Sequence, residues 1–186
     1  EICLIADEPY RFLNFDNVEI PSLFSVYANS VVIGSYSKNL SLAGERIGYV
    51  AVNPAMPCAE ELIRAVTLTT RILGYVNAPT VAQQILKSCI DSQVDLNIYR
   101  ERRAAMAKVL DDAGIEYTMP RGAFYFFPRS PLADESKFIE KLVEERILAV
   151  PGRGFGCPGY IRLAFCVSKE IIERSAEGFK RAVRNC

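Results

Sequence analysis

The sequence of 186 residues contains no histidine. This absence excludes Ser-His-Asp and Cys-His catalytic sites, the HExxH helix of metalloproteases, and every zinc or haem site that uses a histidine ligand. The chemistry of the protein must therefore depend on lysine, tyrosine, arginine, serine, cysteine or carboxylate side chains, or on a bound cofactor.

Long runs of one kind of residue are also missing. The 22 basic and 22 acidic residues balance, and no basic run is concentrated enough to predict a nucleic-acid or anionic-membrane surface. No apolar stretch approaches the roughly 18 residues that indicate a membrane span. We therefore expect neither nucleic acid nor membrane as a partner.

The cysteines form no CxxC pair. Without histidine they make a poor zinc set, and a chain of this length does not read as a disulfide scaffold. We expect reduced cysteines, a cytoplasmic location and no metal site. The six are Cys3, Cys58, Cys89, Cys157, Cys166 and Cys186.

Half of the residues are apolar, which is enough for a buried core. Apolar runs predict strands over 2–6, 31–34 and 47–52, and the first reads as buried on both faces, as in a parallel sheet. Helical patterns follow over 60–73 and 79–90. The sequence therefore predicts an α/β domain up to about residue 98.

The second half has a different pattern, typical of a small α+β domain. An amphipathic helix over 97–113 ends at Gly114, and the last helix begins at Ser168 and buries Ile171 and Ile172. The other predicted elements are strands over 116–119, 123–127, 147–150 and 160–165 and a helix over 136–146.

One polar segment follows the second predicted strand. Residues 34–38 read Gly-Ser-Tyr-Ser-Lys, and Arg46 comes eight residues after Lys38. Ligands bind where the strands of α/β sheets end. Two serines, an arginine and glycines suit a phosphate, and Lys38 is a further phosphate contact, a nucleophile or simply a surface lysine.

Two other places carry similar signals. The first predicted strand ends in Asp7 and Tyr10, a carboxylate and a phenol, and Arg162 lies within the apolar strand over 160–165. A buried arginine needs an anionic partner. Since that strand offers no carboxylate, we expect the partner to be a ligand.

Taken together, these motifs resemble the C-terminal half of a fold-type I, class I/II aminotransferase that depends on pyridoxal phosphate. They are the D-x-x-Y pair, the S-x-S-K segment with its arginine, the turn over 122–125, V-P-G-x-x-F-G and I-R-L. Each is weak alone, but their order and spacing are specific. The resemblance implies that 1–98 is the C-terminal part of the large domain, a mostly parallel sheet with helices, and that 99–186 is the small α+β domain.

The resemblance also implies roles around the cofactor ring. Lys38 matches the lysine that forms the Schiff base with pyridoxal phosphate and then moves the substrate proton. Asp7 matches the carboxylate beneath the pyridine nitrogen, which keeps that nitrogen protonated. Tyr10 matches the phenol that hydrogen-bonds the ring oxygen.

The remaining roles concern anionic groups. Ser35, Ser37 and Arg46 match the residues that hold the cofactor phosphate, and Arg162 matches the arginine that holds the substrate α-carboxylate. The resemblance thus implies an aminotransferase that exchanges an amino group between an amino acid and a 2-oxo acid, as a homodimer with sites at the interface.

Other readings stay open. The same scaffold also serves lyases and synthases, because the cofactor does the hard chemistry and the fold does not determine its outcome. A ligand-sensing, aminotransferase-like domain of a transcription regulator is a third reading. We expect this chain to be the latter part of a longer protein and to lack the N-terminal half of the family. If the parent protein is an active transaminase, we expect this piece alone to be inactive or nearly so.

Overall fold

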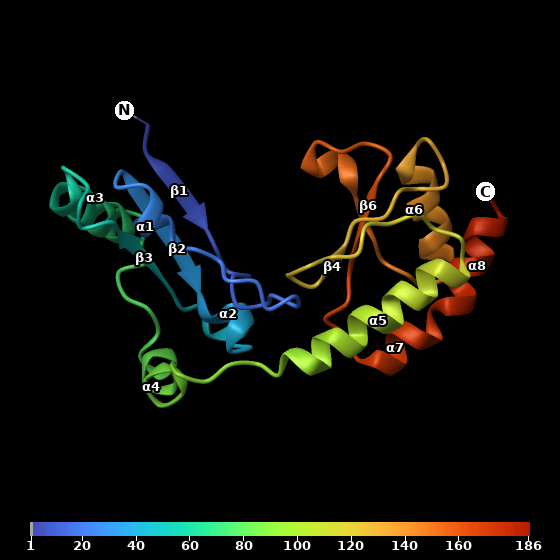
Figure 1. Cartoon of the computed structure of the whole chain (residues 1–186), viewed down its shortest axis with the longest axis horizontal. Helices are drawn as coiled ribbons and strands as arrows, with labels where there is room; N and C mark the ends of the chain where they lie inside the picture. Colours follow the sequence, from blue (N-terminus) through green and yellow to red (C-terminus); the bar gives the residue numbers. More distant parts are fainter. Residues whose placement is uncertain (1) are drawn as a thin grey trace. The chain divides into compact units, whose positions relative to one another are not determined.

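The computed structural model describes residues 2–186, and the chain divides into two compact units, 1–94 and 95–186 (Figure 1). The predicted division after residue 98 lies within the first turn of α5 (Leu96–Asp112). Asp95 caps that helix, since its side chain accepts a hydrogen bond from the Asn97 N–H at 2.8 Å. The whole of α5 therefore belongs to the second unit.

The first unit contains a three-stranded sheet in the order β1-β2-β3 (Figure 1). Its strands are β1 (Leu4–Asp7), β2 (Ser30–Ser35) and β3 (Gly48–Val52). β1 runs parallel to β2, whereas β3 is antiparallel to it. The parallel pairing expected for this sheet is therefore found between β1 and β2 but not between β2 and β3. The short elements after β2 turn the chain back at the same edge, and a parallel strand would need a longer crossover.

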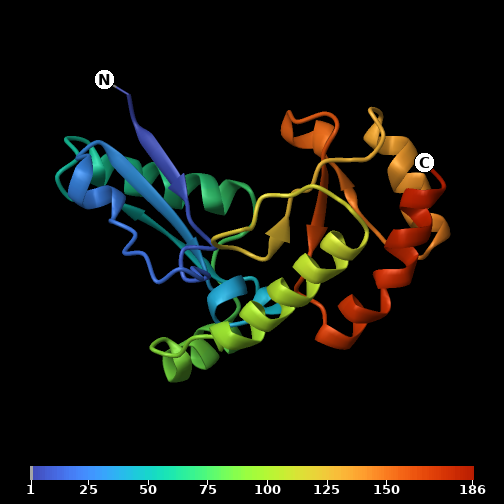
Figure 2. The ribbon, with the colours of Figure 1, turned by 45° about the vertical axis from the view of Figure 1, so that its right-hand side comes forward.

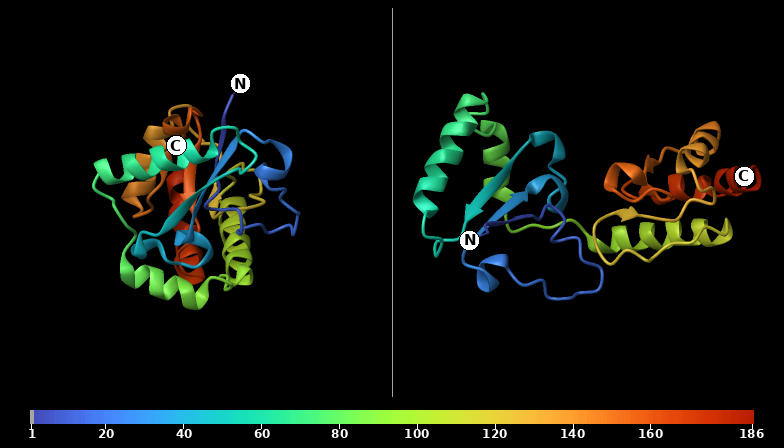
Figure 3. Two further views of the ribbon diagram at one scale, coloured as in Figure 1. Left: turned by 90° about the vertical axis from the view of Figure 1, so that its left-hand side faces the viewer. Right: turned by 90° about the horizontal axis from the view of Figure 1, so that it is seen from above.

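Helices of different lengths connect and cover these strands. α1 packs against β2, and α3 packs against β3 (Figure 3). α2 and the 3₁₀ helix η1 follow one another at the edge where β2 ends. The bounds are α1 Leu23–Val26, α2 Tyr36–Asn39, η1 Ala43–Glu45, α3 Ala59–Ile72 and α4 Thr80–Cys89.

A buried asparagine joins α1 to the sheet. The side chain of Asn53 donates hydrogen bonds to the carbonyls of Phe24 at 3.2 Å and Tyr27 at 3.1 Å, and to the Ser30 hydroxyl at 3.3 Å. Its own carbonyl accepts a bond from the Ala55 N–H at 3.0 Å. The Ser30 hydroxyl also donates to the Tyr27 carbonyl at 2.5 Å, so Asn53 completes a small network of buried polar groups.

The apolar side chains of the first unit are poorly covered. Leu4 and Ile5 of β1 are 43% and 65% exposed, and Ile72 of α3 is 73% exposed. The expectation that the first strand is buried on both faces is therefore wrong for the described chain. Such burial needs helical layers on both faces of a sheet, and residues 2–186 do not supply them around β1.

The second unit contains an antiparallel sheet in the order β4-β6-β5. α5 packs against α7 and α8, and α6 contacts α8 and β5 (Figure 2). The bounds are β4 Tyr125–Phe126, α6 Glu135–Glu144, β5 Val150–Pro151, the 3₁₀ helix η2 Gly152–Phe155, β6 Ile161–Ala164, α7 Lys169–Arg174 and α8 Ala176–Arg184.

An aromatic core fills this unit. Phe126, Phe138, Phe165 and Phe179 are almost completely buried, and the rings of Phe126 and Phe165 meet edge to face at 5.5 Å. α5 adds its predicted apolar face, with Met106, Val109 and Leu110 buried, and ends at Gly114, whose φ is +70°. Glycine adopts this left-handed conformation without steric cost, so this predicted helix end is confirmed.

Several predicted elements of the second half differ. Residues 116–119 form no strand, although the Arg129 N–H donates to the Glu116 carbonyl at 2.9 Å. The single helix predicted after Ser168 is divided into α7 and α8 at Ser175, whose hydroxyl donates to the Ile172 carbonyl at 2.6 Å. This local bond competes with the regular helical pattern. Within α7, Ile172 is buried as predicted, whereas Ile171 is 53% exposed, against the prediction.

Two findings concern the whole described chain. All six cysteines are free thiols. Among residues 2–186, no helix has the length and apolar character needed to cross a membrane.

Candidate functional site

Two polar segments follow the parallel strands of the first unit. Asp7 is the last residue of β1 and lies opposite Ile33 of β2, two residues before Ser35. The Glu8 N–H donates to the Ile33 carbonyl at 2.9 Å, so the pairing continues beyond Asp7. Because both strands end at the same edge, Asp7 and Tyr10 reach the edge that carries the segment 35–38.

Lys38 lies in the single turn of α2, directly after β2. Its side chain is half-buried, and Nζ lies 5.8 Å from the centroid of the Tyr10 ring. A cation at this distance over an aromatic face is attracted by the electrons of the ring. The structure thus brings together Lys38 and Tyr10, two of the residues that the sequence singled out.

The two serines are held by their own hydrogen bonds. Ser35 caps α2, and its hydroxyl accepts a bond from the Ser37 N–H at 3.2 Å. The Ser35 hydroxyl also donates to the Ser37 hydroxyl at 2.8 Å. The two hydroxyls therefore lie side by side at the end of β2, where both can contact one anionic group.

Arg46 reaches the same edge from β3. Gly48 pairs with Ser35, and the Tyr36 N–H donates to the Ile47 carbonyl at 3.3 Å, so Arg46 lies just beyond the paired residues. Its side chain is exposed and donates to the Ala43 carbonyl at 2.9 Å. Arg46 has a φ of +53°, a left-handed conformation that is costly for arginine and that is often found at functional sites.

Close backbone approach shapes this edge. A Cβ atom on Gly48 would lie 2.6 Å from the Gly34 carbonyl oxygen, so the antiparallel pairing of β2 and β3 requires glycine there. The Tyr49 ring covers Gly34, and burial, with a smaller contribution from Tyr49, raises the pKa of Tyr36. The Tyr36 phenol, which lies in α2 two residues before Lys38, therefore stays neutral.

Arg162 belongs to the second unit. It is half-buried in β6, and its Cζ atom lies over two aromatic rings, 4.6 Å from the centroid of Tyr125 and 4.5 Å from that of Phe155. Among residues 2–186 no carboxylate forms an ion pair with Arg162. The guanidinium group is thus partly desolvated without an internal counter-ion, which favours an anionic ligand.

Sequence reasoning missed the partners of Arg162. Tyr125 and Phe155 stand in two of the quoted motifs, but their contact with the guanidinium depends on how the turn over 122–125 and η2 fold. It also missed Glu135, which is 1% exposed and binds Arg153 at 2.8 Å. The predicted helix over 136–146 began one residue after Glu135, so no sequence signal marked this pair.

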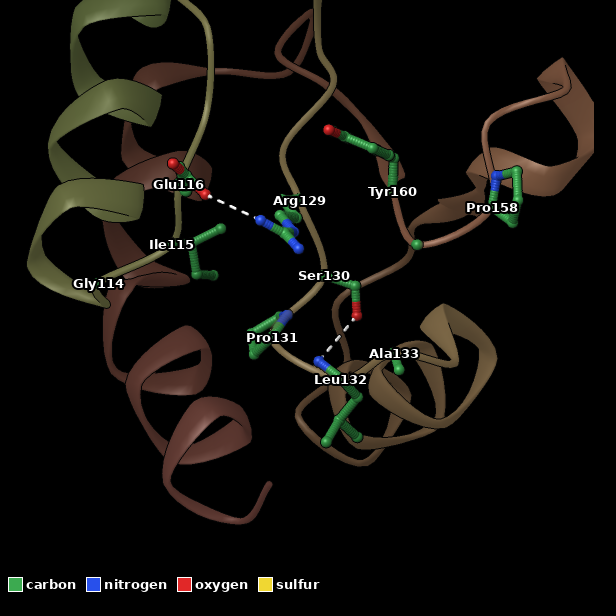
Figure 4. A pocket seen from close by; sticks show the side chains of 11 residues that line it. Gly114, Ile115, Glu116, Arg129, Ser130, Pro131, Leu132, Ala133, Pro158 and Tyr160 are labelled. Carbon is green, nitrogen blue, oxygen red and sulfur yellow. Dashed lines mark hydrogen bonds and ion pairs between the residues drawn. The ribbon is translucent and has the colours of Figure 1, made fainter.

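The second unit also has a surface hollow of about 680 Å³ that involves none of the predicted site residues (Figure 4). Arg129 and Glu116, which lie at this hollow, face each other at 3.7 Å, and the Leu132 N–H donates to the Ser130 hydroxyl at 3.2 Å. Arg129 thus pairs with Glu116, and Ser130 with the backbone of Leu132, inside the hollow itself. Across residues 2–186, no three histidine, cysteine, aspartate or glutamate side chains come together as a metal site.

Comparisons with known proteins agree on one family. The family model described as aminotransferase class I and II matches residues 1–179. The chain is 30% identical to a probable aspartate/prephenate aminotransferase of Aquifex aeolicus, over 97% of this chain and 48% of that protein. It is 33% identical to the aspartate aminotransferase of Thermotoga maritima, over 96% of this chain and 46% of that protein.

Solved structures give the same result. An aminotransferase from Eubacterium rectale superposes with a TM-score of 0.90 at 41% identity, over 97% of this chain and 46% of that one. The α-aminoadipate aminotransferase LysN of Thermus thermophilus, solved with N-(5'-phosphopyridoxyl)-L-leucine, gives 0.83 at 25% identity, over 99% and 50%. The chain spans about half the length of the relatives that it matches.

Proposed function

Because the chain belongs to the class I and II aminotransferases, we propose that it forms the C-terminal part of an enzyme that moves an amino group between an amino acid and a 2-oxo acid. The cofactor is pyridoxal phosphate, and the attachment residue is Lys38. The observation that carries this proposal is the meeting of Lys38, Tyr10 and the serine pair at one edge of the sheet.

The side chains at this edge fit the chemistry of the cofactor. The Ser35 and Ser37 hydroxyls, 2.8 Å apart, and the Arg46 guanidinium are donors suited to a phosphate. Tyr10 offers a phenol to the ring oxygen, and Asp7 offers a carboxylate to the ring nitrogen. When bound, pyridoxal phosphate supplies an electron sink that stabilises negative charge on the substrate α-carbon.

Lys38 has two tasks in this proposal. Its Nζ atom would hold the cofactor through the aldehyde carbon, with loss of water, and the amino group of the substrate would displace it. The displaced amine would then accept the proton from the α-carbon and return it elsewhere on the substrate. Its half-buried position over the Tyr10 ring restricts the directions in which the amine can move.

Arg162 orients the substrate. A guanidinium forms two parallel hydrogen bonds with a carboxylate, and this fixes both the position and the rotation of the α-carbon. The two rings over which Arg162 lies hold the guanidinium plane without using its N–H groups. These N–H groups are thus available to the α-carboxylate.

We also propose that the whole protein is a cytoplasmic homodimer and that residues 1–186 alone have little or no activity. The uncovered apolar side chains of β1 support this view, because they call for further protein to pack on them. Mixing the purified chain with pyridoxal phosphate, an amino acid and a 2-oxo acid tests the inactivity, and robust turnover would contradict it.

The decisive experiment concerns Lys38 in the full-length protein. We expect a cofactor absorbance band that is lost in Lys38→Ala, and borohydride reduction should fix the cofactor on the peptide that contains Lys38. Lys87→Ala, a change of an exposed lysine on α4, is the matched control and should keep the band.

A transaminase further requires that pyridoxamine formation depends on the amino donor and is reversed by a 2-oxo acid. Elimination or condensation products without this exchange would point to a lyase or synthase. A protein that binds the cofactor and an amino acid without turnover would point to a sensing domain.

A further inference from the structure

A buried carboxylate organises the loop before β6. Glu135 lies in the first turn of α6 with 1% of its side chain exposed. Its Oε1 atom accepts bonds from Arg153 Nε at 2.8 Å and from the Arg153 N–H at 3.2 Å. Oε2 accepts from Arg153 Nη2 at 3.2 Å and from the Gly159 N–H at 2.9 Å. The carboxylate is thus fully hydrogen-bonded, as a buried charge must be.

These bonds join both ends of the loop 152–159 to one side chain. The loop is also closed internally, since the Gly152 N–H donates to the Tyr160 carbonyl at 2.7 Å and the Cys157 N–H donates to the Gly152 carbonyl at 3.0 Å. A Cβ atom on Gly152 would lie 2.3 Å from the Cys157 carbonyl oxygen. The loop has little room for another shape while Glu135 holds it.

Phe155 lies between the two points of attachment, and its ring is one of the two that Arg162 lies over, at 4.5 Å. The ring also meets Phe127 edge to face at 6.1 Å. The acidic residues at the start of α6 are both bound to Arg153, since Asp134 accepts from Arg153 Nη2 at 2.6 Å. The carboxylates of Asp134 and Glu135 therefore pair with Arg153, and neither of them pairs with Arg162.

We propose that Glu135 is a positioning residue for the substrate carboxylate: through Arg153 and Gly159 it holds the loop 152–159 so that Phe155 stays packed on Arg162. This inference rests on the proposed function, in which Arg162 binds the α-carboxylate. Glu135 itself touches neither substrate nor cofactor. The hydrogen bonds from Arg153 lower the pKa of Glu135 to about 2. The Glu135 carboxylate therefore stays ionised at every pH at which an aminotransferase is assayed.

The first test measures packing and does not depend on activity. The chain has no tryptophan, so Phe155→Trp introduces a single fluorophore beside Arg162. We expect acrylamide to quench this fluorophore several-fold more strongly when Glu135→Gln is added. Glu145→Gln is the matched control, because Glu145 lies at the other end of α6 and binds Arg181 at 2.6 Å. Equal quenching in the two backgrounds would overturn the proposal.

The second test measures substrate binding in the full-length, cofactor-loaded protein. Glu135→Gln should raise KM for the amino acid by about 10- to 100-fold and leave kcat within about threefold, since the loss concerns binding shared by ground and transition states. The cofactor absorbance should not change. Glu145→Gln should leave both constants unchanged. If Glu135→Gln does not fold, Phe155→Leu removes the same contact and should raise KM in the same way.

Arg162→Lys separates the two possible failures. If Arg162→Lys leaves KM unchanged, the proposed role of Arg162 is wrong. If Arg162→Lys raises KM but Glu135→Gln and Phe155→Leu do not, Arg162 binds the carboxylate without help from the loop, and the inference about Glu135 is wrong while the proposed function stands.

Discussion

The two compact units differ in how they bury their apolar residues. Most of the buried apolar side chains belong to the second unit, where Phe126, Phe138, Phe165 and Phe179 form one aromatic core. The first unit has few buried apolar residues, and it exposes apolar side chains on β1, β3, α3 and the segment after α3. Its buried residues also include Asn53, whose side chain donates to the Tyr27 carbonyl and the Ser30 hydroxyl.

This difference shows which unit has a complete core of its own. The second unit satisfies the usual requirement of a small domain, a continuous apolar interior between a sheet and helices. The first unit has a sheet whose outer strands β1 and β3 carry exposed apolar side chains, and such surface normally packs on more protein. The chain spans about half the length of its relatives, which agrees with this view.

The largest effect is expected in the aromatic core of the second unit. Phe126→Ala should lower the free energy of unfolding by about 3–5 kcal/mol, because it removes a fully buried ring and leaves a cavity. Urea denaturation measures this change. Leu148→Ala, at a residue that is 83% exposed, is the control and should stay within about 0.5 kcal/mol. If both variants lower the free energy of unfolding by a similar amount, the aromatic core is not what stabilises the second unit.

In the first unit the corresponding substitution removes a buried polar side chain. Asn53→Ala should lower the free energy of unfolding by about 1–3 kcal/mol, because the Phe24 carbonyl loses its side-chain donor and the Tyr27 carbonyl keeps only the Ser30 hydroxyl while the site stays buried. Amide hydrogen exchange of β2 and β3 would detect the loss. Asn77→Ala is the control at an exposed asparagine and should leave exchange unchanged. No increase in exchange for Asn53→Ala would mean that water replaces the asparagine at little cost.

The pH dependence of stability should also distinguish the units. The pKa of Glu135 is lowered by its bonds with Arg153 from 4.5 to about 2. Its contribution is therefore complete above pH 4.5 and is lost as the pH falls towards 2. Urea midpoints between pH 6 and pH 2 should show this loss for the second unit. Glu135→Gln should flatten the curve but not abolish it, since the pKa values of Asp134, Glu145 and Glu177 are lowered too.

The smallest effect on stability is expected on β1. Ile5→Lys should change the free energy of unfolding by less than about 0.5 kcal/mol, because Ile5 is 65% exposed. The same change should reduce self-association of the chain in light scattering, since a charged edge strand resists pairing. Ser92→Lys adds the charge at an exposed polar residue and should leave scattering unchanged. If both variants scatter alike, the apolar surface of β1 is not what drives association.

Local patterns predicted most of the longer helices and the candidate site. The helical periodicity of α5 and the glycine after it predicted both the buried face and the end of that helix. Lys38, Ser35 and Ser37 stand within four residues of one another, so any strand that ends there brings them to one edge. The roles of these residues remain proposals, because they depend on a cofactor and on the remainder of the protein.

Sequence by itself determined the composition of the site, the family motifs and the helical faces, because these depend on residues that are neighbours along the chain. Only the tertiary structure decided that β3 runs antiparallel to β2, that Asn53 joins α1 to the sheet, and that Glu135 binds Arg153. These contacts join residues separated by many positions. Their formation depends on how the chain turns and on which polar groups lose contact with water when they are buried. Neither can be predicted from the spacing of residue types along a short segment.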